Sequence, residues 1–193
     1  MQKIKLACIT YKKLERLTRE AIRQIDDEML DIRVIDTSMK NLTENIDQLL
    51  DDDIDVFIAG GAYAEIIKST VKKPVVTIQL SPIDLIKALL KSKEYGQRIA
   101  IASYEPLLLL DSLDYEGMMN VSITNLVFDS DFDLSRKLDA SQFDALIGGS
   151  VSNDLATKQG LPSVLIYKGH ESVINAINEA KRLATALFDE KKN

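Results

Sequence analysis

Two glycine pairs are the residues of this chain whose type and position best suit binding chemistry. Gly60-Gly61 follows the apolar run 56–59, and Gly148-Gly149 follows the apolar run 145–147. Glycine lets backbone N–H groups approach a ligand closely, and the first N–H groups and positive dipole end of a following helix suit a carboxylate or phosphate. For either pair alone, a tight strand-to-helix turn is an equal alternative. Because the pair occurs twice, we favour a shared ligand site.

The other binding candidates follow the ends of the remaining expected strands. Ligands of open parallel sheets bind beyond the carboxyl ends of the strands. Ser81 also has a structural interpretation, because Ser81 and Asp84 have the spacing of a helix-capping box. Tyr104 also has a structural interpretation, since most tyrosines are packing residues. The full set of predicted ligand-binding residues is Thr10, Tyr11, Gly60, Gly61, Ala62, Ser81, Ser103, Tyr104, Gly148, Gly149, Ser150 and Gly169.

The sequence offers little material for catalysis or metal binding. His170 is the only histidine, and we expect it to be a neutral surface residue. Cys8 is the only cysteine, which excludes a disulfide within the chain and disfavours two-lobed racemases that use a pair of cysteines. The acidic run 51–53 with Asp55 is interpreted as a solvated turn. Phosphate-loop, dinucleotide and nucleophile-elbow motifs do not occur, so we expect no enzyme, no metal and no cofactor.

Composition limits the partners of the chain. It has 193 residues, a net charge of -6 and a pI of about 4.9. Such an acidic protein repels phosphate backbones, so we expect no direct contact with nucleic acid. The apolar run at the N-terminus is too short for a signal peptide or membrane span, which predicts a cytoplasmic protein that does not enter the membrane.

Short aliphatic runs that alternate with helical patterns predict an α/β fold. The strand candidates are 4–9, 32–36, 56–59, 75–80, 98–103, 121–127, 145–147 and 164–167. Helices are expected over 14–30, from Ser81, from Ser130 and over about 171–188. Several strands are apolar almost throughout, as in parallel sheets that are covered on both faces. Alternation of strand and helix also implies parallel strands with right-handed crossovers.

An internal repeat indicates how these elements are grouped. The segment 55–61 aligns with 144–150, and the segment from Gly96 restarts a strand like the one that begins the chain. After a one-residue gap, Pro74 aligns with Pro162. The repeat predicts two similar three-layer α/β/α lobes with parallel four-stranded sheets, 1–95 and 96–193, around a central cleft. Whether the last helix packs on its own lobe or crosses to the other stays open.

The order of the motifs resembles the N-terminal domain of the propionate catabolism activator. The matching strings are DVFIAGGA at 55–62, KPVV at 73–76, SPIDL at 81–85, IASY at 101–104, GGSVSNDLA at 148–156 and GLPSVLIY at 160–167. Together they cover nearly the whole chain. The string Lys168-Gly169-His170 has no counterpart among the family landmarks.

The resemblance implies a sensor that precedes an AAA+ ATPase interacting with sigma-54 and a DNA-binding domain. The best-known member responds to 2-methylcitrate, a tricarboxylate, and ligand relieves restraint of the ATPase. We therefore expect a small-molecule effector, a carboxylate or phosphate, that binds between the lobes, an ATPase partner in cis or in trans, and relay through the last helix. A homodimer, a small isomerase, lyase or chelatase using the same cleft, and a module that has no ATPase partner remain alternatives.

Overall fold

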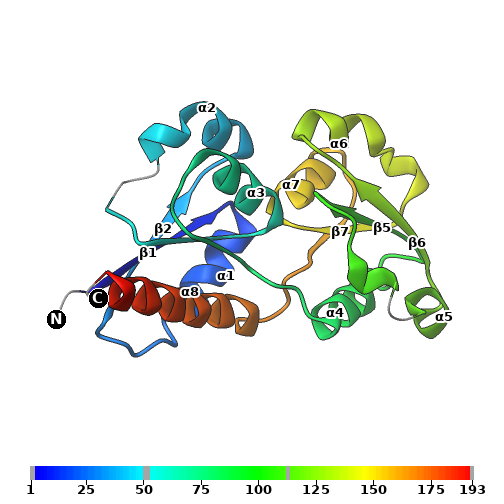
Figure 1. Ribbon diagram of the computed structural model, residues 1–193. Helices are drawn as coiled ribbons and strands as arrows, with labels where there is room; N and C mark the ends of the chain where they lie inside the picture. The colour runs from blue at the N-terminus through cyan, green and yellow to red at the C-terminus, as the bar shows by residue number, and fades with distance from the viewer. Residues whose placement is uncertain (1–2, 50–52, 112–113, 192–193) are drawn as a thin grey trace. The chain divides into compact units, whose positions relative to one another are not determined.

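The chain forms two compact units in the computed structural model, which describes residues 3–49, 53–111 and 114–191. The first unit consists of Met1–Gln79 and Gly169–Asn193, and the second is the continuous segment Leu80–Lys168. Each unit is built on one four-stranded parallel sheet with helices on its faces (Figure 1). The α/β fold with two parallel four-stranded sheets, predicted from the sequence, is confirmed.

The first unit has the strand order β2-β1-β3-β4. Its strands are β1 (Ile4–Thr10), β2 (Leu30–Asp36), β3 (Val56–Ala59) and β4 (Val75–Thr77). Its helices are α1 (Lys13–Ile22), α2 (Met39–Leu49), α3 (Gly61–Thr70) and the twenty-residue α8 (Glu171–Glu190).

The second unit repeats this arrangement with the order β6-β5-β7-β8. Its strands are β5 (Arg98–Ser103), β6 (Ser122–Val127), β7 (Ala145–Gly148) and β8 (Ser163–Leu165). Its helices are α4 (Pro82–Ser92), α5 (Tyr115–Met119), α6 (Asp131–Lys137) and α7 (Ser150–Lys158), with the short 3-10 helices η1 (Leu108–Asp111) and η2 (Ala140–Gln142).

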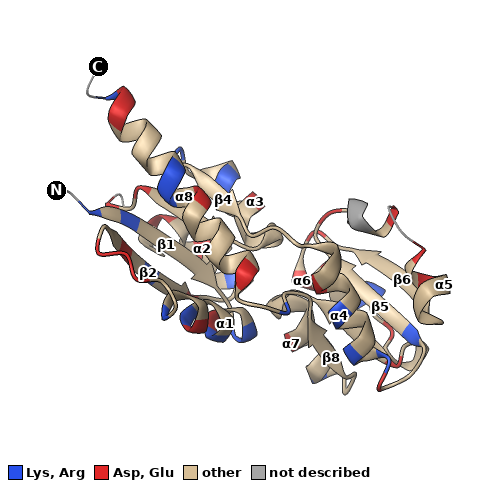
Figure 2. Ribbon diagram, turned by 90° about the horizontal axis from the view of Figure 1, so that it is seen from below, with Lys and Arg blue, Asp and Glu red and all other residues tan. Residues whose placement is uncertain are grey.

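The inner strands explain why both faces of each sheet need helices. Every residue of β3 and of β7 is buried, and neither strand contains a charged residue. Figure 2 shows the same pattern, because charged residues lie mainly on helices and connecting loops. Apolar side chains alternate between the two faces of a strand, so burial on both faces requires a layer of helices on each side.

Hydrogen bonds at the amino end of each sheet repeat almost atom for atom. The N–H of Lys5 donates to Asp55 Oδ2 at 2.8 Å, and the N–H of Arg98 donates to Asp144 Oδ2 at 2.9 Å. In return, each aspartate N–H donates to the carbonyl of the same partner residue, at 2.8 and 2.7 Å. Gly96 sits beside this second contact with a φ of +153°, and a Cβ there would lie 2.4 Å from the Asp144 carboxyl group. The repeated contacts support the duplication seen in the sequence.

One helix of each sequence repeat belongs to the other unit. Helix α4 follows β4 in the chain but packs on β7 and β8, whereas α8 follows β8 but packs on β1, β3 and β4. Figure 1 shows α8 alongside the strands of the first unit. The boundaries of the units therefore fall after Gln79 and Lys168, and they differ from the division at residue 95 that the repeat predicted.

The helix expected over 14–30 is wrong in its second half, because α1 ends at Ile22 and β2 begins at Leu30. Between them lie three successive acidic residues, which oppose the negative end of a helix dipole. Asp27 accepts a hydrogen bond from the N–H of Met29 at 3.0 Å, and such a local contact favours a turn. The Asp27 carboxylate also forms an ion pair with Lys181 at 2.5 Å. The strands expected over 75–80 and 164–167 are also shorter in the structure, where β4 covers Val75–Thr77 and β8 covers Ser163–Leu165.

We expect replacement of Asp144 by asparagine to lower stability at neutral pH but not in strong acid. The hydrogen bonds from Arg98 lower the pKa of Asp144 from 3.8 to about 2. A carboxylate whose pKa is depressed by folding stabilises the native state above its unfolded pKa, and this contribution is lost as the pH falls towards the folded value. The urea midpoint of Asp144→Asn should therefore fall below that of the wild type at pH 7, and the two should converge between about pH 4 and 2.

Asp47→Asn is the matched control, because Asp47 is exposed on α2. A constant difference between Asp144→Asn and the wild type across this pH range would contradict the assignment.

Candidate functional site

The carboxyl-end edge of the first sheet brings together most of the binding residues predicted for that half. Strands β1 and β3 are parallel neighbours in which Ile9 lies opposite Ala59. The next residues, Thr10 and Gly60, therefore reach the same edge of the sheet. Gly60 is the N-cap of α3, and no side-chain hydrogen bond caps this helix. The edge thus presents the start of a helix whose capping position has no side chain.

The second sheet repeats this edge with equivalent residues. Strands β5 and β7 pair with Ile101 opposite Ile147, and Ser103 ends β5. Gly149 is the N-cap of α7, again without a side-chain cap hydrogen bond. Other helices of this unit differ, because Ser130 caps α6 and Asp114 caps α5 through their side chains.

The glycines at the two helix starts are not required by backbone conformation. Gly60 and Gly149 both have a φ of -71°, which any residue can adopt. A Cβ built on Gly61 or on Gly149 would meet no atom within 4 Å. Gly148, in contrast, is demanded by packing, because a Cβ there would lie 2.8 Å from the Cβ of Ser152 and 3.2 Å from the carbonyl oxygen of Ala102. Glycine at 61 and 149 instead leaves open space beside the helix starts.

The remaining predicted residues of the first unit differ in exposure. Thr10 is 1% exposed and its hydroxyl lies 3.5 Å from the carbonyl oxygen of Ile35, so it faces the sheet. Tyr11 and Ala62 are partly exposed next to the same edge. Gly169 also belongs to the first unit, because the chain has left the second unit at Lys168.

In the second unit, Tyr104 packs edge-on against Phe128 with their ring centroids 6.2 Å apart, so its packing interpretation is correct in part. Ser150 is buried in the first turn of α7.

The capping interpretation of Ser81 is confirmed. The Ser81 hydroxyl accepts a hydrogen bond from the N–H of Asp84, and the N–H of Ser81 donates to the Asp84 carboxylate, both at 3.1 Å. Asp84 Oδ1 also accepts the N–H of Lys168 at 3.3 Å. Because α4 packs on the second sheet, Ser81 lies in the second unit and not at the end of β4, where the sequence placed it.

Asn153 was missed by the sequence analysis and organises the edge of the second sheet. Its amide nitrogen donates to the carbonyl oxygens of Gly148 at 2.8 Å, Gly149 at 2.9 Å and Val164 at 3.2 Å. The side chain is 1% exposed and so joins the ends of β7 and β8 from inside the unit. Sequence pattern offered no clear signal for this role, because Asn153 is one of several polar residues in α7.

The single cysteine and the single histidine of the chain lie in different surroundings. Cys8 is 1% exposed within β1, and burial raises the pKa of its thiol to about 12. His170 lies beside α1, with Nε2 3.2 Å from Glu20 Oε2 and Nδ1 2.5 Å from the amide nitrogen of Gln24. The hydrogen bond from His170 lowers the pKa of Glu20.

Within the described ranges, no group of three or more His, Cys, Asp or Glu side chains could hold a metal ion. Asp51 and Asp52 of the acidic run lie outside these ranges, while Asp53 pairs with Lys5 at 2.5 Å. Across the same ranges, no helix is long and apolar enough to cross a membrane.

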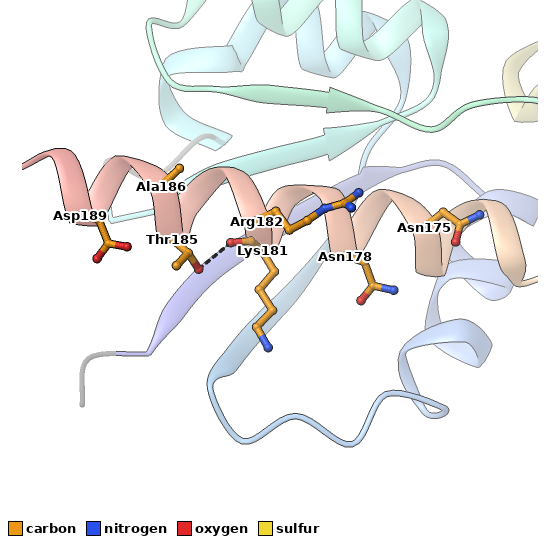
Figure 3. A pocket seen from close by; sticks show the side chains of 7 residues that line it. All are labelled: Asn175, Asn178, Lys181, Arg182, Thr185, Ala186 and Asp189. Atoms are coloured by element: carbon orange, nitrogen blue, oxygen red, sulfur yellow. Dashed lines mark hydrogen bonds between the residues drawn. The ribbon is translucent and has the colours of Figure 1, made fainter.

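An open hollow runs along the outer side of α8 (Figure 3). Most of its lining side chains are exposed and polar, and Lys181 pairs with Asp27 at 2.5 Å. The lining residues are Asn175, Asn178, Lys181, Arg182, Thr185, Ala186 and Asp189. The hollow contains none of the residues predicted to bind ligand.

Comparison with known proteins gives matches over most of the chain. The family profile described as "Propionate catabolism activator" matches residues 26–190. The crystal structure of an NtrC family transcriptional regulator from Clostridium acetobutylicum has a TM-score of 0.79 at 26% identity, covering 96% of this chain and 99% of that chain. The ABC domain in complex with L-Trp from Streptococcus pneumonia has a TM-score of 0.52 at 11% identity, covering 96% and 85%, which shows a shared fold alone.

We expect Asn153→Leu to destabilise the second unit. The change removes a buried donor and leaves carbonyl oxygens of three residues with one hydrogen bond fewer, so the free energy of unfolding should fall by roughly 2–3 kcal/mol. Urea denaturation followed by circular dichroism measures the difference. Asn178→Leu, on the exposed side of α8, should change stability by less than about 0.5 kcal/mol. Equal effects of the two changes would show that Asn153 does not organise this edge.

Proposed function

Because the chain belongs to the propionate catabolism activator family, we propose that it senses a small organic anion, a carboxylate or phosphate, for a transcription regulator of the NtrC type. The proposal includes control of an AAA+ ATPase, in cis or in trans. The observation that carries the binding step is the repeated helix start, with a glycine N-cap and no side-chain cap, at the carboxyl edge of both sheets.

The chemistry of these helix starts favours an anion. The first N–H groups of a helix lack partners within the helix, and its dipole places partial positive charge at this end. A helix whose N-cap is glycine has no side chain of its own to satisfy these donors. Open space where a Cβ would stand at Gly61 and Gly149 allows a carboxylate or phosphate oxygen to approach.

A sensor explains the site better than a small cleft enzyme does. The single thiol is buried inside β1 with its pKa raised to about 12, so it is protonated near neutral pH and unsuited to act as a base. The single imidazole is engaged by Glu20 on α1 and by Gln24 in the turn that follows it. Binding alone suffices for a sensor, because a ligand shifts a conformational equilibrium by its differential affinity for the two states.

A thermal-shift screen tests the binding step directly. The screen uses 2-methylcitrate, citrate, succinate and inorganic phosphate, with neutral sugars at equal concentration as controls. A ligand present at about 100 times its Kd should stabilise the native state by about 2.7 kcal/mol, which raises the melting temperature measurably. If none of the anions stabilises the chain, or if one of them is turned over chemically, the sensor proposal is overturned.

We expect Gly61→Ala and Gly149→Ala to separate binding from folding. Both positions have room for a methyl group, so the unliganded variants should still fold. Gly61→Ala, inside α3, should be as stable as the wild type or more stable by about 0.4–1 kcal/mol. Gly149→Ala should be somewhat less stable than the wild type, because alanine is less favourable than glycine at an N-cap. The added methyl group narrows the approach to the helix start, so the Kd of the stabilising anion should rise at least tenfold, measured by isothermal titration calorimetry.

Gly160 provides the matched comparison, because it also has open space around it but a φ of +75°. Gly160→Ala should therefore lower stability and leave the Kd unchanged. Unchanged affinity in both Gly61→Ala and Gly149→Ala would remove the helix starts from the binding site.

A further inference from the structure

Two equivalent positions at the sheet edges carry opposite charges. The N–H of Thr37 donates to the carbonyl of Thr10 at 2.9 Å, and the N–H of Phe128 donates to the carbonyl of Ser103 at 3.0 Å. Thr10 and Ser103 are therefore equivalent in the two units. The residue after each is a tyrosine, and the next residue is Lys12 in the first unit and Glu105 in the second.

Lys12 has an unusual backbone conformation. Its φ is 45° and its ψ is -108°, and among the described residues Asn120 is the one other non-glycine with a positive φ. The N–H of Lys12 donates to Asp36 Oδ1 at 3.1 Å, which holds the turn before α1. Glycine adopts such a conformation more easily than lysine does. Strain of this kind persists at functional positions when the surrounding structure holds it.

The ammonium group of Lys12 lies at the predicted binding edge. Its Nζ is 5.2 Å from the centroid of the Tyr11 ring, and Tyr11 is one of the residues that the sequence predicted to bind ligand. Helix α1 begins at the next residue, and Lys12 makes no side-chain cap hydrogen bond to it. Because β1 and β3 are neighbours, the starts of α1 and α3 and the charge of Lys12 add at one edge, where Asp36 at the end of β2 contributes one carboxylate.

The edge of the second sheet has the opposite character. Glu105, Asp129 and Asp131 are exposed in the segments that follow β5 and β6. Strand β5 is followed by the short η1 and not by an α-helix. The second edge therefore has less of the partial positive charge that a helix start supplies. Carboxylates at this edge repel an anionic group and favour a neutral or cationic one.

From this asymmetry we infer that Lys12 is the residue that selects a negatively charged effector, and that the anionic group is bound at the edge of the first unit. The inference rests on the proposed function and names the specificity determinant of the same site.

Charge-reversal variants of the full chain test the inference, with the anion from the panel that most stabilises the wild type as the probe. Lys12→Glu should raise the Kd of this anion at least tenfold, Lys12→Arg should bind within threefold of the wild type, and Glu105→Lys should bind as tightly or more tightly. Lys40→Glu is the matched control, because Lys40 is exposed near the start of α2 at the same edge and undergoes the same charge change. It should raise the Kd less than threefold.

A second variant distinguishes a loss of binding from a loss of folding. Lys12→Gly removes the ammonium group and relieves the backbone strain, so its unliganded melting temperature should equal or exceed that of the wild type while its affinity falls. The inference is overturned if Lys12→Glu and Lys12→Gly bind like the wild type, if Lys40→Glu has the effect of Lys12→Glu, or if Glu105→Lys weakens binding equally. If the wild type binds no anion of the panel, the proposed function fails instead.

Discussion

Burial of two parallel sheets on both of their faces is the constraint on which the rest of the structure depends. The inner strands β3 and β7 are buried along their whole length, so each sheet needs helices on both sides. One of the helices on each sheet comes from the other sequence repeat: α8 covers the first sheet and α4 covers the second. Each helix follows in sequence a strand of the other unit. The chain therefore passes between the units twice, after Gln79 and after Lys168.

The same constraint fixes where ligand chemistry can occur. Parallel strands end at one edge of their sheet, and the helices that follow them begin there, so backbone donors gather at that edge without any need for charged side chains. Asp55 and Asp144 fasten the opposite end of each sheet through matching hydrogen bonds to β1 and β5. A duplicated fold thus carries two edges of the same design.

The two edges have diverged in charge while keeping the same backbone. Thr10 and Ser103, followed by Tyr11 and Tyr104, are equivalent by their hydrogen bonds, but the next position is a lysine in one unit and a glutamate in the other. Divergence of this kind makes one edge of a duplicated scaffold more favourable for an anion than the other. It also reconciles recognition of an anion with a chain whose net charge is -6.

Local pattern in the sequence determined the strands, the repeat, the capping box at Ser81 and the glycine helix starts, because each depends on neighbours within a few residues. The sequence also indicated the family through the order of its motifs. Tertiary structure alone decided that α4 and α8 cover the sheet of the other repeat, since periodicity shows that a helix has an apolar face but not which sheet receives it. It likewise decided the shorter α1, the positive φ of Lys12 and the three carbonyl contacts of Asn153. These features rest on partners distant in sequence or on backbone strain, neither of which residue type reveals.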